Sequence, residues 1–142
     1  MLPALLTDTV TSDLDRALHY TLLWGLEAVE LRTVGGAGDR VPFVNEAKLK
    51  RRLAEAEMPV AAVVPGMFEG PAGARAAWLN ELAAFDETLH FCDRIGCRRV
   101  VVSAFAAEEP SPEAAADALT RAGRAAARHG IEVAVLNEAG GA

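Results

Sequence analysis

Three glycines occupy equivalent junctions in this chain, each between a helix-like segment and a short apolar run. Gly25, Gly96 and Gly130 are each followed by a stretch rich in valine, leucine or isoleucine. Glycine favours the left-handed backbone conformation that ends many helices. Short β-branched runs have the length of buried strands. The repeated order of helix, glycine and strand therefore predicts a parallel sheet built from βα units.

The remaining segments extend this pattern to about five strands and four helices in one domain. We expect Ser12 to cap the first helix, with Asp15 completing a capping box, and Asn45 and Ser111 to cap the second and fourth. The third helix is predicted from apolar residues that recur at spacings of three and four. The expected strands are 4–7, 28–32, 60–64, 99–103 and 132–136, and the expected helices are 12–24, 45–57, 78–95 and 111–129.

Composition limits the partners of the chain. The 142 residues carry a formal charge of −6, which argues against a nucleic-acid surface. No apolar run approaches the roughly 20 residues of a membrane span, and the N-terminus lacks the basic region of a signal peptide. Cys92 and Cys97 have no second pair to complete a zinc site, so we expect small buried apolar side chains. These features favour a cytoplasmic protein without nucleic-acid or membrane partners.

Polar residues at the expected strand ends are the candidate ligand-binding residues, because parallel βα sheets bind ligands at the carboxyl ends of their strands. Glu30 and Arg32 are two residues apart and share one face of an extended strand. A carboxylate and a guanidinium there can hold a hydroxylated or anionic ligand, or form an internal ion pair. The other polar residues at strand ends are Thr7, Asp8, Thr9, Ser103, Asn137 and Glu138.

We interpret the three histidines and a glycine-rich stretch as structural features of the chain. His19 and His90 lie within expected helices and His129 ends one, so we expect all three on helix surfaces or ends. The glycine-rich stretch 35–38 lacks the ending of a phosphate-binding loop, and we interpret it as a connector. No Gly-x-Gly-x-x-Gly follows the first strand, so a dinucleotide-binding fold has no support.

With these residues identified, the chain resembles the sugar phosphate isomerase/epimerase family, the xylose-isomerase-like TIM barrels. Residues 25–32 are similar to the family's Gly-Leu-x-x-Val-Glu-Leu-Arg second strand, and 45–61 resemble its second helix and third strand. Residues 127–138 resemble the family's fifth strand. The resemblance spans the chain but covers only the first half of the family's barrel. It implies parallel βα units of an incomplete TIM barrel over 1–142.

The resemblance also implies site residues and a cofactor. Glu30 and Glu138 correspond to catalytic positions, and Arg32, Asp8 and Asn137 to substrate-binding positions. The family uses a divalent metal (Mn, Mg, Zn or Co), but Leu136 stands where its fifth-strand glutamate ligand would be. Only a one-residue register shift would bring Glu138 into that role, and it would turn the neighbouring side chains to the opposite face. The isolated chain is therefore expected to bind divalent metal weakly or not at all.

The implied function is proton transfer next to the carbonyl of a sugar or sugar phosphate. We expect the chain alone to be incomplete for catalysis, whether it is a fragment, part of a split barrel or a decayed relative. The alternative is a non-catalytic half-barrel that interacts with itself or with a partner. Either interpretation predicts a homo-oligomer or a missing C-terminal half, because five strands leave two open edges. A metal-dependent apurinic-site nuclease of the same superfamily is disfavoured by the acidic charge.

Overall fold

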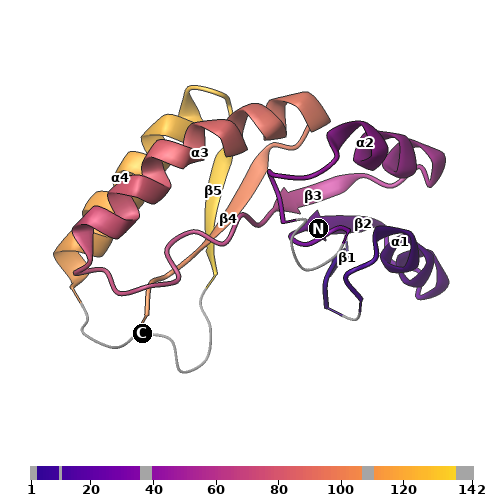
Figure 1. The fold of residues 1–142 in the computed structure, drawn as a ribbon, viewed down its shortest axis with the longest axis horizontal. Coiled ribbons are helices and arrows are strands. Elements are labelled where there is room, and N and C mark those ends of the chain that lie inside the picture. The colour runs from indigo at the N-terminus through magenta and orange to yellow at the C-terminus, as the bar shows by residue number, and fades with distance from the viewer. Residues whose placement is uncertain (1–2, 10, 36–39, 107–110, 137–142) are drawn as a thin grey trace.

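Strands and helices alternate strictly along the computed structural model, which describes residues 3–9, 11–35, 40–106 and 111–136. All neighbouring strands are parallel, and their spatial order is β1-β2-β3-β4-β5. Figure 1 shows the helices along the outer side of the curved sheet. The predicted fold class, parallel βα units of an incomplete TIM barrel, is confirmed. The elements are β1 (Ala4–Leu6), α1 (Leu14–Leu23), β2 (Ala28–Leu31), α2 (Glu46–Glu55), β3 (Val60–Val63), α3 (Arg75–Ile95), β4 (Arg99–Ser103), α4 (Pro112–Ala127) and β5 (Glu132–Leu136).

The three junction glycines adopt the left-handed conformation and share one hydrogen-bond pattern. Their φ angles are 70° at Gly25, 77° at Gly96 and 66° at Gly130. At each junction the residue after the glycine donates its N–H to the carbonyl five residues earlier. These bonds join Leu26 to Thr21 at 2.9 Å, Cys97 to Cys92 at 2.9 Å and Ile131 to Ala126 at 3.0 Å. The same turn therefore directs α1, α3 and α4 into β2, β4 and β5.

Alternation along the strands separates an apolar core from a more polar concave face. Val29 and Leu31 of β2, like Val100 and Val102 of β4, are almost completely buried in the core cluster. Glu30, between the two core residues of β2, is only partly buried. Both cysteines are buried in the same core, as predicted. No helix in the described part of the chain is long and apolar enough to cross a membrane.

Several predicted element ends need correction. Asp13, not Ser12, is the N-cap of α1, because the Asp13 carboxylate accepts the Arg16 N–H at 3.0 Å. Ser111 is at the N-cap of α4 but makes no side-chain capping bond there. β1, β2 and β3 each end one residue earlier than predicted, and α4 ends at Ala127. Of the glycine-rich stretch 35–38, residues 36–38 lie outside the described part of the chain.

The left-handed junctions predict opposite effects of alanine at two glycines. Gly96→Ala is expected to lower the free energy of unfolding by about 1–2 kcal/mol, because an L side chain is strained at positive φ. Gly123 lies within α4 and also has open space around it, so Gly123→Ala is the matched control. We expect this control to raise the free energy by about 0.5–1 kcal/mol. Urea denaturation checks both values, and destabilisation by the two substitutions alike would contradict the junction geometry.

The sheet has two edge strands among the described residues, β1 and β5. β5 exposes apolar surface at its C-terminal end, where Val135 is 46% and Leu136 40% exposed. Unpaired strand edges with exposed apolar side chains favour association with another chain. Self-association of the chain therefore stays a prediction that this exposed edge supports.

We expect the chain to sediment as a dimer or larger species at micromolar concentration. Val135→Lys should shift it toward monomer, because a charge on an edge strand opposes strand addition. Leu79→Lys is the control, since Leu79 is 37% exposed but lies on α3. A wild-type chain that stays monomeric with a cooperative thermal transition would contradict the prediction.

Candidate functional site

An ion pair joins the carboxyl ends of β1 and β2. Asp8 lies two residues beyond β1, and Arg32 immediately follows β2. The Arg32 Nε donates to both carboxylate oxygens of Asp8, at 2.9 and 2.8 Å. The Arg32 Nη2 lies 2.7 Å from Asp8 Oδ1. The two side chains are 31% and 16% exposed, so the pair is partly buried but open to solvent.

Backbone contacts position this pair. Thr7 is fully buried, and its hydroxyl accepts the Arg32 backbone N–H at 3.1 Å. The Thr7 backbone N–H donates to the Glu30 carbonyl at 2.9 Å, which extends the β1–β2 pairing beyond the strand ends. Burial opposes the charge on Asp8, but hydrogen bonds from Arg32 and Thr33 hold the pKa of its carboxyl below the ordinary value. Asp8 therefore carries a negative charge at neutral pH.

Glu30 lies on the concave face, deeper in the sheet than the Asp8–Arg32 pair. It lines a hollow of about 660 Å³ together with Ala4, Arg99 and Glu132, the first residues of β1, β4 and β5. The hollow therefore extends toward the N-terminal ends of the strands. Glu30 was expected at the C-terminal mouth of the sheet, but the hollow that it lines lies on the N-terminal side of that mouth. Within the described residues its carboxylate has no hydrogen-bond or ion-pair partner.

The loops after β3 and β4 are held together by two stacked aromatic residues that sequence reasoning missed. The rings of Phe68 and Phe105 are 4.7 Å apart and nearly parallel. Both residues are buried and have positive φ, 62° and 67°, which is uncommon for a bulky side chain. The Phe105 N–H donates to the Phe68 carbonyl at 2.9 Å, and the Phe68 N–H donates to Glu81 at 2.7 Å. These contacts shape the same edge of the sheet as the ion pair.

Arg40 is a second cation at this edge that was not predicted. It pairs with Thr33 through an isolated antiparallel bridge, and its Nη2 contacts Glu69 at 3.3 Å. Gly66 leaves room for the Arg40 guanidinium, because a Cβ at that position would collide with it. No sequence signal distinguishes Arg40 from the other arginines, since its proximity to Gly66 and Glu69 arises only from the fold.

The described residues do not form the family's metal site at the strand ends. Asn137 and Glu138, the other two predicted site residues, lie outside the described part of the chain. The carboxylates of Asp8 and Glu69 near this edge are each bound to an arginine. Leu136 has no ligand atom, and the three histidines lie on α1, on α3 and just after α4. The donor set at this edge therefore does not fit a divalent metal without further ligands.

Comparison with known proteins identifies the fold as part of a TIM barrel. Residues 19–141 match the family described as xylose isomerase-like TIM barrel. The chain belongs to this family, as the resemblance predicted. A comparison with curated proteins gave no significant match.

Solved structures of similar fold include two sugar epimerases and a zinc-binding protein. An apo structure of YcjR, a 3-keto-D-glucoside 4-epimerase from E. coli, has a TM-score of 0.68 and 18% identity over 95% of this chain and 56% of its own. IolI with a bound zinc atom has a TM-score of 0.72 and 17% identity, over 95% and 51%. A D-allulose 3-epimerase from Methylomonas sp., in complex with D-allulose, has a TM-score of 0.66 and 14% identity, over 94% and 50%. The chain thus spans about half the length of these proteins.

The lowered pKa of Asp8 predicts a pH-dependent contribution to stability. Asp8→Asn is expected to lower the free energy of unfolding at neutral pH by about 1–2 kcal/mol, because a hydrogen bond between charged groups is lost. A carboxyl whose pKa is lower in the folded state stabilises the fold above its unfolded pKa of about 3.9. That contribution is lost as the pH falls through the folded-state value, so the difference between wild type and variant should shrink.

Urea unfolding from about pH 7 to about pH 3 measures this difference. Glu27→Gln is the control, because Glu27 is exposed and lies just before β2. Its effect should be small. A wild-type advantage over Asp8→Asn that did not decrease on acidification would contradict the assigned role of the ion pair.

Proposed function

We propose that this chain supplies the β1–β5 part of a sugar isomerase or epimerase barrel and that its strand ends bind a sugar or sugar phosphate. The observation that carries the proposal is the Asp8–Arg32 ion pair, which is partly open to solvent at the carboxyl ends of β1 and β2. Ligands of parallel βα barrels bind at that edge. Family membership and the two sugar epimerases of similar fold support the substrate class.

In this proposal Arg32 binds an anionic or hydroxylated end of the substrate. Asp8 contacts the guanidinium through Nε and Nη2 and so fixes the orientation of its plane. Planar guanidinium groups recognise phosphate and carboxylate oxygens with two parallel hydrogen bonds. Asp8 would then contribute by positioning Arg32 and by accepting a bond from a neighbouring hydroxyl.

Glu30 would bind a sugar hydroxyl deeper in the barrel. Glu30 and Arg32 are expected to share one face of the chain, and residues two apart in an extended strand are about 7 Å apart. A pyranose or open-chain sugar can span that distance. Glu138 and Asn137 remain proposed catalytic and substrate-binding residues from the family resemblance.

The reaction class that this arrangement suits is proton abstraction next to a carbonyl group. Carboxylates act as general bases in such reactions when they lie within hydrogen-bond reach of the acidic carbon. In this proposal Glu30 orients the substrate for that step. Residues beyond the described part of the chain would have to supply the remaining acid–base groups.

Sugar binding by the full chain tests the proposal. We expect D-allulose or a 3-keto-glucoside to perturb the NMR signals of residues at the strand ends. Glu30→Gln and Arg32→Gln should each weaken binding at least tenfold, equivalent to about 1.4 kcal/mol, because each loses a charged hydrogen-bonding group. Solvent deuterium incorporated next to the carbonyl would report proton abstraction in the same sample.

Two exposed residues of the same types are the matched controls. Glu27→Gln, just before β2, and Arg51→Gln, on α2, change the same side-chain types away from the strand ends. Both should bind sugar as the wild type does. If neither sugar binds, or if Glu30→Gln and Arg32→Gln bind it unchanged, the site assignment is wrong.

The alternative, a non-catalytic interaction module, is favoured by one observation. The exposed apolar side chains of Val135 and Leu136 lie on an edge strand, where a second sheet can add. A chain that self-associates through β5 and binds no sugar would support this alternative.

A further inference from the structure

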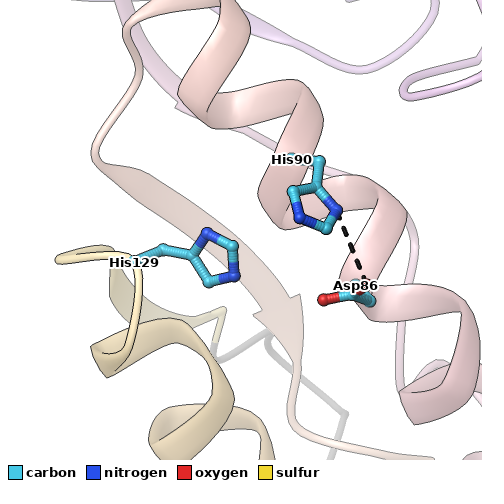
Figure 2. A group of neighbouring side chains, drawn as sticks. All are labelled: Asp86, His90 and His129. Carbon is cyan, nitrogen blue, oxygen red and sulfur yellow. Dashed lines mark ion pairs between the residues drawn. The ribbon is translucent and has the colours of Figure 1, made fainter.

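A second cluster of polar side chains lies on the outer helical surface, away from the strand ends. Asp86 and His90 are four residues apart on α3, so they share one face of that helix. His129 follows the C-terminal end of α4 and approaches the same face. Figure 2 shows the three side chains directed toward one another across the space between the helices.

The geometry of this cluster fits a small metal ion. One ligand atom from each of Asp86, His90 and His129 can be chosen so that all three lie within 4.8 Å of one another. The His90 Nδ1 is 3.5 Å from Asp86 Oδ2, and the two imidazole rings are 5.2 Å apart at 83°. Ligand atoms around a tetrahedral zinc ion are about 3.3 Å apart, given bonds of about 2.0 Å. Small rotations of the exposed His90 and Asp86 side chains would bring the three ligand atoms to that spacing.

The third ligand, His129, is already oriented by its neighbours. Its Nδ1 lies 2.6 Å from Asp93 Oδ2, and Asp93 in turn accepts a 2.8 Å bond from Arg98. Arg98 also donates to the His129 carbonyl at 3.1 Å. A carboxylate on one ring nitrogen directs the other toward a metal, as is usual for metal-bound histidines. With Nδ1 held by Asp93, the Nε2 of His129 remains as the ligand atom.

We propose that Asp86, His90 and His129 bind a divalent transition-metal ion of the zinc type, with water completing the coordination. Two imidazoles and one carboxylate suit zinc, nickel or copper, whereas calcium and magnesium prefer oxygen ligands alone. This site is separate from the strand ends, where Leu136 led us to expect weak or absent metal binding. We expected the histidines on helix surfaces and at helix ends, and the fold brings two of them together there.

The site would connect two consecutive βα units. α3 leads into β4 and α4 leads into β5, so a metal held between His90 and His129 joins the two helices just before these strands begin. This is the N-terminal side of the sheet, opposite the Asp8–Arg32 pair. In βα barrels that side serves stability, and catalysis takes place at the other. The bound ion would therefore stabilise the fold.

Zinc alone, titrated into the metal-free full chain, tests the proposal. Calorimetry should show one equivalent bound with micromolar affinity, and zinc should raise the thermal unfolding midpoint. His90→Ala, Asp86→Asn and His129→Gln should each weaken binding at least tenfold, because each removes one ligand. The His90 and Asp86 side chains are 50% and 71% exposed, so their substitution leaves the core intact. Circular dichroism checks the fold of each variant.

His19→Ala is the matched control, because His19 is an exposed histidine on another helix, α1. It should bind zinc as the wild type does. The proposal is wrong if zinc does not bind, if any ligand variant binds it with wild-type affinity, or if His19→Ala loses binding equally. Since the readout needs no sugar, the result is independent of the function proposed above.

Discussion

The turn that follows a helix and starts the next strand is the constraint on which this structure depends. At Gly25, Gly96 and Gly130 the chain takes a left-handed conformation, and the next residue donates to a carbonyl in the last turn of the helix. Each turn satisfies helix carbonyls that would otherwise lack partners and sends the chain back parallel to the previous strand. Because all strands then run in one direction, their carboxyl ends gather at one edge.

The two faces of the sheet have different physical roles. The outer face buries valine and leucine against the helices, and this burial supplies most of the driving force for folding. The concave face carries Glu30, Arg99 and Glu132 around an open hollow. Charged groups persist there because water or neighbouring charges solvate them. The same alternation that builds the core therefore places charged side chains where a ligand or further strands would meet the sheet.

Polar clusters at opposite ends of the βα units arise from different elements. The Asp8–Arg32 pair comes from segments just after β1 and β2, and hydrogen bonds of the Thr7 hydroxyl and backbone N–H hold it in place. The cluster of Asp86, His90 and His129 comes from α3 and from the turn just after α4. We propose that the first binds a sugar hydroxyl or anion and that the second binds a metal ion.

Local sequence determined the elements, their order and the face on which each strand residue lies, because helix caps, glycine turns and alternation depend on neighbours along the chain. Strands 99–103 and 132–136 were predicted to the residue. Only the tertiary structure decided which distant side chains meet. It paired Arg32 with Asp8 and packed the Arg40 guanidinium against Gly66. It also stacked the rings of Phe68 and Phe105 and placed the His90 ring next to that of His129. Such contacts depend on how the sheet curves and how its helices pack, and those features follow from the sum of many weak interactions along the whole chain.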